Sequence, residues 1–306
     1  MAPKQTHGDY RRYEPAMSQP LPGDIGIVNL ARSEAAKAEI TVRPLRGNIS
    51  VLVGSGGNIA VFSGPDGKLI VDAGISVSRP KIAAALAAVS PDPIRYLINT
   101  HWHFDHTGGN QWAHSEGATI IAHENTRKHL STITRVDDWD FTFPPLPEDA
   151  LPTEVFKTDR TLSINGTTIV LEYYGPCHTD GDISAQFSEA DVFITGDTWW
   201  NGFYPFIDYS TGGSINGMIR ATEANLAKVT DKTIIIPGHG PVGDKIQLTE
   251  YRDMLVNMRD RVADIKKPGR SLAEVVTAKP SAAYDAKWGR FLIDGSFFTR
   301  LVYAGV

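Results

Sequence analysis

The sequence has a single cysteine, Cys177, among its 306 residues. One thiol cannot close a disulfide within the chain, so nothing in the sequence requires an oxidising compartment. One thiol also cannot build the thiolate-rich zinc sites that hold some small domains together. A role for Cys177 as a reactive thiol stays open at this point.

Long apolar segments are absent as well. The longest uncharged apolar runs are the size of one strand, as at 234–236, far below the ~20 residues that cross a bilayer. The N-terminal segment carries Lys4, Asp9, Arg11, Arg12 and Glu14 where a secretory signal has an apolar core. We therefore expect a cytoplasmic protein with no membrane partner, unless a leader peptide has been removed.

A surplus of positive charge is also missing. The 30 Lys and Arg residues are outnumbered by 35 Asp and Glu residues, which leaves a formal net charge of −5. Binding of a polyanion by bulk charge needs a surplus of Lys and Arg facing the phosphates. The charge balance argues against nucleic acid as a partner and leaves a small molecule as the expected one.

What the sequence does contain is enough apolar material for a core, with hydrophobic residues making up 42% of the chain. Residues 1–38 hold several prolines and show little periodicity, which predicts an irregular arm with a short helix over 33–38. Residues 39–306 are expected to form a single domain whose C-terminal part is a helical extension.

Short β-branched runs begin at Ile40 and are separated by glycine-rich turns, which is typical of successive strands. The turn at 54–57 has enough glycine to suggest a phosphate-binding loop, but it lacks the Lys-Ser/Thr ending and lies between two strands. We interpret it as a turn. The acidic, proline-rich stretch 137–152 is interpreted as a linker rather than a lid.

Helix and strand patterns alternate through the rest of the chain. The expected helices cover 79–89, 124–131, 214–229 and 248–265. The expected strands include 94–98, 118–122 and 233–236, and Asn165-Gly166 marks a hairpin. Two successive blocks of strands followed by helices predict an α/β layered fold, an αββα sandwich of two mixed β-sheets flanked by helices.

The strongest chemical signal is the segment 101–106, His-Trp-His-Phe-Asp-His, which directly follows an apolar strand. His101 and His103 are two residues apart in extended backbone, so their side chains project to the same side and can share one metal ion. Asp105 and His106 lie where the chain turns, and offer a carboxylate and an imidazole to a second ion. Two ions need more donors than one loop supplies, so further ligands must come from elsewhere.

Three further donors each follow an apolar strand in the second half of the chain: His178, Asp197 and His239. Sites assemble in the loops at strand ends, so donors on different strands can meet there. Any one of these histidines alone is more simply explained as a packing residue, but the set indicates a metal site. The remaining histidines have no such context and are expected on the surface or in the core: His7, His114, His123 and His129.

These motifs resemble those of the metallo-β-lactamase fold superfamily over roughly residues 40–243. The matching pieces are LIVDAG at 69–74, HWHFDH at 101–106, CHTDGD at 177–182, TGD at 195–197 and PGHG at 237–240. The resemblance implies that Asp72 supports the histidine loop. Cys177 and Asp180 stand where the family often has Gly and Pro, and we see no reason for this to break ligation.

The same resemblance implies two Zn²⁺ ions, with Fe or Mn as alternative metals. One zinc ion would be held by His101, His103 and His178. The second would be held by Asp105, His106 and His239. Asp197 and a hydroxide would bridge the two ions.

Asp197 also bears on the branch of the superfamily. True β-lactamases of this fold usually carry a cysteine or a non-ligand at the corresponding place, whereas lactonases and glyoxalase-II-like thioesterases resemble this chain in carrying Asp. The resemblance therefore implies a dinuclear zinc-dependent hydrolase whose metal-bridging hydroxide attacks the carbonyl of a lactone, thioester or related ester or amide. Asp105 could also accept or relay a proton as a catalytic residue. No Gly-x-Ser-x-Gly elbow supports a serine nucleophile.

Aromatic residues follow Asp197 directly and fill the loop 199–209. Beside a metal pair, such a loop would favour a substrate with an apolar or aromatic part, and Tyr204 could act catalytically by hydrogen-bonding an oxyanion. Alternatively, these rings pack in the core or at a subunit interface. A homo-oligomer also stays open, because the apolar face of 248–265 and the C-terminal segment could cover a partner.

Four other functions compete with a carbonyl hydrolase. His101, His178 and Asp197 alone would suit a mononuclear iron dioxygenase of the persulfide dioxygenase type. A β-lactamase and a phosphodiesterase occur in the same superfamily, although the net charge disfavours a nucleic-acid substrate. A non-enzymatic binding protein would be marked by missing ligands, and none of the expected ligands is missing.

Overall fold

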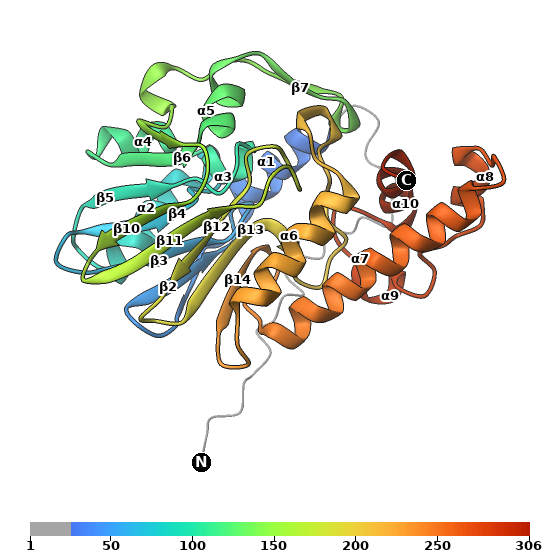
Figure 1. Ribbon diagram of the computed structural model, residues 1–306. Coiled ribbons are helices and arrows are strands. Elements are labelled where there is room, and N and C mark those ends of the chain that lie inside the picture. The colour runs from blue at the N-terminus through green and yellow to red at the C-terminus, as the bar shows by residue number, and fades with distance from the viewer. Residues whose placement is uncertain (1–25) are drawn as a thin grey trace.

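The computed structural model describes residues 26–306 as two β-sheets packed face to face with helices on both outer sides (Figure 1). Each sheet contains both parallel and antiparallel strand pairs. The predicted αββα sandwich of two mixed sheets is therefore confirmed. His7 and the predicted irregular arm up to residue 25 lie outside the described residues.

The first sheet has seven strands in the order β1-β2-β3-β4-β5-β6-β9. Their bounds are β1 (Thr41–Pro44), β2 (Ile49–Val53), β3 (Ile59–Phe62), β4 (Lys68–Val71), β5 (Ile94–Ile98), β6 (Thr119–His123) and β9 (Glu154–Phe156). The strands β1 to β4 form an antiparallel meander, whereas β4, β5, β6 and β9 run parallel. Parallel neighbours need a crossover, which α2 (Arg79–Val89) supplies between β4 and β5.

The second sheet has five strands in the order β10-β11-β12-β13-β14. Their bounds are β10 (Arg160–Ile164), β11 (Thr167–Tyr173), β12 (Ile183–Phe187), β13 (Val192–Trp200) and β14 (Ile234–His239). All neighbours are antiparallel except β13 and β14, which are connected through the crossover helix α6 (Ile215–Lys228). Consequently the C-terminal ends of β13 and β14 lie side by side, and each brings a predicted ligand there.

Three clusters of buried apolar side chains match the layers. One lies between the two sheets, with Val51 and Val71 of the first facing Leu171 and Phe187 of the second. A second packs the first sheet against α2, and the third packs the second sheet against α6 and α7 (Lys245–Lys266). Burial of apolar surface on both faces of both sheets, at roughly 25 cal/mol per Å², is the main force that holds the layers together.

The remaining helices lie around the two sheets. Their bounds are α1 (Ile27–Lys37), α3 (Phe104–Thr107), α4 (Asn110–Ser115), α5 (Glu124–Ser131), α8 (Leu272–Thr277), α9 (Asp285–Trp288) and α10 (Gly295–Ala304), with short 3₁₀ turns at 76–78, 137–139, 148–150 and 209–211. The expected elements at 79–89, 94–98 and 124–131 are found with the same bounds. Helix α7 begins three residues before the expected start at 248, because Asp244 and Gln247 form a capping box.

Two expectations about the connecting segments were wrong. Helix α1 begins at Ile27 rather than at 33, and its N-cap is Gly26, which offers no side-chain signal for a helix start. The stretch 137–152 is not a plain linker, because it contains β8 (Phe141–Phe143), which pairs with β7 (Thr134–Val136) in a two-stranded sheet. Figure 1 shows this hairpin extending from the first sheet toward the second half of the molecule.

No helix in residues 26–306 is both long enough and apolar enough to cross a bilayer.

Candidate metal centre

The histidine-rich segment leaves the end of β5 and turns into the short helix α3. His103 is the N-cap of α3 and still has extended backbone, with φ −60° and ψ 147°. Asp105 and His106 lie within α3. The chain therefore turns between the two pairs of donors, as the spacing of the motif predicted.

One donor cluster brings together His101, His103, His178 and Asp197, whose ligating atoms all lie within 4.8 Å of one another. Nε2 of His178 lies 2.9 Å from Nδ1 of His103 and 3.4 Å from Oδ2 of Asp197. All four side chains are buried. The loop after β11 therefore brings His178 to the histidines that follow β5.

A second cluster consists of Asp105, His106 and His239. Nε2 of His239 lies 3.2 Å from Oδ2 of Asp105 and 3.4 Å from Nε2 of His106. His239 is the last residue of β14, so it reaches the other two from the second sheet. Each cluster thus combines donors from both sheets.

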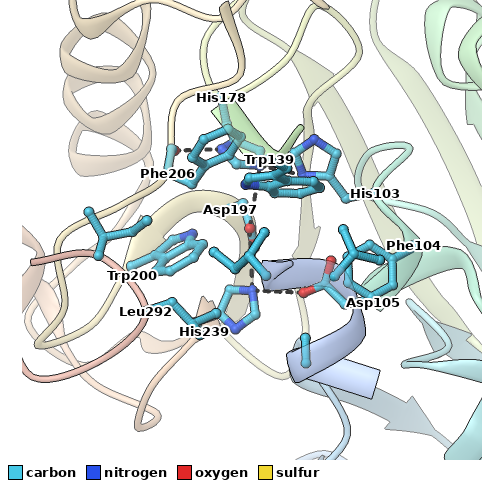
Figure 2. A pocket seen from close by; sticks show the side chains of 14 residues that line it. His103, Phe104, Asp105, Trp139, His178, Asp197, Trp200, Phe206, His239 and Leu292 are labelled. Carbon is cyan, nitrogen blue, oxygen red and sulfur yellow. Dashed lines mark hydrogen bonds and ion pairs between the residues drawn. The ribbon is translucent and has the colours of Figure 1, made fainter. Parts of the chain in front are cut away.

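Asp197 lies between the two clusters. Its Oδ1 is 3.1 Å from Nε2 of His106, and its Oδ2 is 3.3 Å from Nε2 of His239 and 3.4 Å from Nε2 of His178. Figure 2 shows the carboxylate below His178 and above His239, with Asp105 beside His239. One carboxylate therefore approaches both donor groups.

A β-bulge positions Asp197. The residue does not end its strand, as the sequence suggested, because β13 continues to Trp200 with its register shifted on both sides of Gly196. Gly196 has φ +52°, a conformation that glycine adopts without strain. Across the sheet a Cβ on Gly238 would overlap Oδ1 of Asp197. Bulges next to functional sites commonly redirect a side chain in this way.

Asp72 supports the histidine loop through hydrogen bonds, as the resemblance implied. Its carboxylate accepts hydrogen bonds from the backbone N and the Oγ1 of Thr100, at 2.8 and 2.7 Å, and its Oδ2 lies 2.7 Å from Nδ1 of His106. Asp72 has φ +63°, which is strained for a residue with a Cβ. These contacts orient His106 so that its Nε2 faces the cluster.

Sequence reasoning missed the groups that orient the other two histidines. Oδ2 of Asp208 lies 3.0 Å from Nε2 of His103, and the backbone carbonyl of Phe206 lies 2.8 Å from Nδ1 of His178. Thr211 in turn donates a hydrogen bond of 2.6 Å from its Oγ1 to Asp208. Asp208 is the only acidic residue between 198 and 213, and this was the one available signal in the sequence.

Charges within the site strongly affect its protonation. Burial works against a charge on His239, but Asp197 and Asp105 outweigh it and raise the pKa of this imidazole to about 9. Burial works to raise the pKa of Asp105, but His106 and His239 hold it at about 2. Burial and the neighbouring His106 push the pKa of His101 well below its usual range. The carboxylates are therefore ionised at neutral pH, and the positive charge of protonated His239 partly balances their negative charge.

The donor set fits metal ions. Nε2 of His101 is buried and has no hydrogen-bond partner among the described residues. A buried polar atom without a partner is costly, and a bound cation would satisfy it. Imidazole and carboxylate donors are those preferred by Zn²⁺, Fe and Mn²⁺. The site is therefore a His/Asp cluster capable of binding metal.

The glycine-rich turn at 54–57 leaves room for the imidazole of His106, and we find no role for it as a phosphate-binding loop. A Cβ on Gly57 would overlap the imidazole of His106, so only glycine lets this turn pack against the ring. The next residue, Asn58, donates two hydrogen bonds of 2.9 Å from Nδ2, to the carbonyls of Pro237 and Gly240. This turn of the first sheet is thereby tied to the loop that carries His239.

Tyr204 does not occupy the position expected of a catalytic residue. It is fully buried, it stacks on Phe298 and its hydroxyl donates a hydrogen bond of 3.0 Å to Oδ1 of Asp285. It is not among the residues that line the cavity beside the donor clusters. The structure therefore gives no support to the prediction that Tyr204 binds an oxyanion.

Cys177 precedes the predicted ligand His178 in sequence, but its thiol is buried and unreactive. The thiol is fully buried and donates a hydrogen bond of 3.2 Å to Oδ2 of Asp182. Burial, together with the charge of Asp182, raises the pKa of Cys177 well above its usual range. A thiol in this state is a poor nucleophile, so the reactive-thiol alternative loses its support.

A cavity with an empty volume of about 430 Å³, including the part open to solvent, leads to the donors (Figure 2). His103, Asp105, His178, Asp197 and His239 form its polar end. Its walls are apolar and come from five separate segments. They contribute Ile27, Val28 and Ala31 of α1, Phe104, Trp139, Trp200 and Phe206 of the aromatic loop, and Leu292 and Ile293. The aromatic loop 199–209 is thus divided, with Trp200 and Phe206 lining the cavity and Trp199 and Tyr204 in the core.

Of the histidines expected to be unrelated to metal, the three within the described residues, His114, His123 and His129, lie outside both clusters. Nε2 of His129 lies 2.8 Å from Oδ1 of Asp180, and His123 stacks on Tyr173 with ring centroids 3.9 Å apart. Asp180 therefore has a structural partner at a position where the family often has proline.

Comparison with known proteins agrees with this geometry. The sequence profile described as "Metallo-beta-lactamase superfamily" matches residues 52–265. A hydroxyacylglutathione hydrolase of Polaromonas sp. is 26% identical over 171 residues, which cover 55% of this chain and 57% of the relative. The acyl-coenzyme A thioesterase MBLAC2 of Gallus gallus is 25% identical over 211 residues, which cover 61% of this chain and 73% of the relative.

The fold has solved counterparts as well. The DIM-1 metallo-beta-lactamase superposes with a TM-score of 0.57 at 19% identity, covering 71% of this chain and 97% of the other. The chain spans little more than half the length of the hydroxyacylglutathione hydrolase that it matches. Taken with the profile match over most of its length, these similarities show that the chain belongs to the metallo-beta-lactamase superfamily, with metallo-hydrolases among its relatives.

Proposed function

We propose that this protein is a hydrolase that binds two zinc ions and cleaves the carbonyl bond of a lactone, thioester or related ester. The observation that carries the proposal is the position of Asp197, whose two carboxylate oxygens approach His106 in one donor cluster and His178 in the other. A carboxylate placed between two sets of buried imidazoles suits a bridging ligand.

The proposed ligands divide as the two clusters do. His101, His103 and His178 would hold one ion, and Asp105, His106 and His239 would hold the other. In the pairs His103–Asp208 and His106–Asp72, each imidazole contacts the carboxylate through the ring nitrogen that faces away from its cluster. The nitrogen that faces the cluster is thereby left free to ligate.

When bound, a pair of divalent ions supplies a water of lowered pKa and polarises the carbonyl of the substrate. The residues of the two donor clusters would hold the ions. Asp105 has a pKa of about 2, so it stays a carboxylate over the working pH range. We therefore assign Asp105 a ligand role, in place of the proton relay that the sequence suggested.

Thioesters and lactones are favoured over β-lactams by two observations. By the resemblance given above, Asp197 occupies the place where true β-lactamases usually carry a different residue. Among the relatives, one is named a hydroxyacylglutathione hydrolase and another an acyl-coenzyme A thioesterase. The likeness to the DIM-1 β-lactamase concerns the fold alone.

The test is a metal count combined with a substrate panel. We expect about two zinc ions per chain by elemental analysis, with hydrolysis of a lactone, a thioester or an aryl ester that is lost on chelation and restored by Zn²⁺. One iron per chain, together with oxygen uptake on a persulfide, would establish the dioxygenase alternative instead. Hydrolysis that survives complete removal of metal would overturn the proposal.

A further inference from the structure

The cavity wall beyond the metal ligands indicates which substrates can enter. We propose that the part of the substrate held in this cavity is uncharged and apolar, and that helix α1 sets its size. The inference rests on the proposed hydrolase for the reaction, but it concerns the cavity walls and can be tested by binding alone.

The wall of the cavity is chemically apolar. Apart from the proposed ligands, the cavity is lined by aliphatic and aromatic side chains, and no Lys or Arg is among the described residues that line it. A carboxylate or phosphate that enters a cavity with such walls loses its hydration shell and gains no positive charge in return, which is strongly unfavourable. Anionic groups would therefore have to stay outside, or reach the ions themselves.

Two residues of the wall, Trp139 and Trp200, each carry a neutral hydrogen-bond donor. Nε1 of Trp139 and Nε1 of Trp200 are buried and have no hydrogen-bond partner among the described residues. An uncharged acceptor, such as a carbonyl or ether oxygen, could satisfy an indole N–H without bringing in a charge. These donors suit the carbonyl of an ester or lactone, and they carry no positive charge to balance that of an anion.

Helix α1 is a fixed part of the wall. Its C-terminal end is tied to the first sheet's helices, because Oγ of Ser78 donates to the carbonyl of Ala35 at 2.9 Å and Nζ of Lys81 donates to the carbonyls of Ala36 and Ala38. Farther along the helix, Arg32 lies over the ring of Phe104, 5.5 Å from its centroid. The charge of Arg32 therefore lies against an aromatic ring.

The N-terminal end of α1 faces the cavity through Ile27, Val28 and Ala31. Ala31 is the smallest of the three, so it leaves room that a larger side chain would fill. Ala36 lies on the same helix but is exposed. The pair Ala31→Leu and Ala36→Leu therefore adds the same bulk to one helix, once inside the cavity and once outside it.

The binding test uses two dyes that differ in one charge. N-phenyl-1-naphthylamine is neutral, and 8-anilinonaphthalene-1-sulfonate is the same ring system with a sulfonate. We expect the full chain loaded with Zn²⁺ to bind the neutral dye at least about tenfold more tightly than the sulfonate. Ala31→Leu should weaken binding of the neutral dye, and Ala36→Leu should leave it unchanged.

The hydrolysis test uses three esters. They are phenyl hexanoate, the monophenyl ester of adipic acid, which adds a carboxylate at the acyl end, and 4-carboxyphenyl hexanoate, which adds one at the leaving group. We expect kcat/KM to fall at least about tenfold for at least one of the charged esters, and Ala31→Leu to change KM more than kcat. The end of the substrate whose charge is rejected is the end held in the cavity.

The outcomes separate this inference from the proposed function. If no ester, thioester or lactone is cleaved but the dye preference and its loss in Ala31→Leu are observed, the hydrolase proposal fails and the neutral cavity stands. If all three esters are cleaved with equal kcat/KM, or both dyes bind equally and respond equally to Ala31→Leu, the hydrolase stands and this inference is overturned.

Discussion

Asp208 contacts His103 on the side of the ring that faces away from the donor cluster, with 3.0 Å between Oδ2 and Nε2. The other nitrogen, Nδ1, lies 2.9 Å from Nε2 of His178, inside the cluster. A carboxylate at Nε2 favours a proton there and leaves the lone pair of Nδ1 for a metal ion. Although 105 residues separate the two in sequence, Asp208 therefore selects the tautomer in which His103 can ligate.

The first prediction concerns this contact. Asp208→Asn keeps the size of the side chain but removes its charge, so His103 is no longer held in the ligating tautomer. We expect metal affinity to fall by about 10- to 100-fold, as is typical when the outer partner of a metal-ligating histidine is changed. Zinc affinity is measured by competition with a chelator of known affinity. Asp244→Asn, at the exposed N-cap of α7, is the matched control and should leave zinc affinity unchanged.

The second prediction concerns the carboxylate between the clusters. In Asp197→Asn one charge is lost from a site where both oxygens approach imidazoles. We expect the metal content to fall from about two ions per chain to one or fewer, and hydrolysis to fall by at least about 100-fold. Elemental analysis of the purified variant measures the first effect. Asp260→Asn, on the exposed side of α7, should retain both ions, and two ions in Asp197→Asn would contradict the bridging role.

The third prediction is a pH dependence of the metal-free protein. Asp197 and Asp105 raise the pKa of His239 to about 9 against the opposing effect of burial, whereas a histidine in the unfolded chain has a pKa of ~6.5. A raised pKa means that protonated His239 stabilises the fold fully below pH ~6.5, and that this contribution is lost as the pH rises through about 9.

Urea unfolding of chelator-treated protein between pH 6 and 10 measures this effect. The free energy of unfolding should decrease across the interval, and less steeply in Asp197→Asn, because that variant lacks the carboxylate that most strongly raises the pKa of His239. Zinc binding at pH 7 should also release protons, since ligating imidazoles must be neutral. A flat stability profile would argue that the carboxylates do not face His239 in solution.

The fourth prediction concerns the thiol. Burial and Asp182 raise the pKa of Cys177 above its usual range, so the thiolate is scarce at neutral pH. We expect native protein to react with a disulfide reagent only as fast as it unfolds, and Cys177→Ala to keep full metal content and activity. The substitution should cost about 1–2 kcal/mol of stability, through lost packing and a lost hydrogen bond to Asp182. Fast labelling of the native protein, or loss of activity in Cys177→Ala, would restore a chemical role for the thiol.

The parts of the fold and site that the sequence predicted depend on short-range signals. The donors His101, His103, Asp105 and His106 stand within six residues, and the alternation of strands and helices reports which faces are buried. The apolar strands that precede His178 and His239 likewise indicated where those side chains would emerge. These features are encoded within a few residues of where they act.

The missed features depend on contacts between distant segments. Asp208 could not be linked to His103 because nothing local marks the pair. The aromatic residues after Asp197 look alike in sequence, and only the packing of the C-terminal helices sends Tyr204 to Phe298 while Phe206 faces the cavity. Helix α1 was shortened in the prediction because Gly26 gives no capping signal and the helix packs where the cavity lies.

Each donor group draws on both sheets, and Asn58 adds hydrogen bonds across the same junction. An ion held there would act as a cross-link between chain segments that are 75 residues apart or more, as with His103 and His178 or His106 and His239. Unfolding of either half would then require release of the ion. Metal occupancy should therefore govern how long the protein resists proteases, as well as its catalytic rate. A shortage of zinc would in that case lower the amount of the protein in a cell as well as its activity.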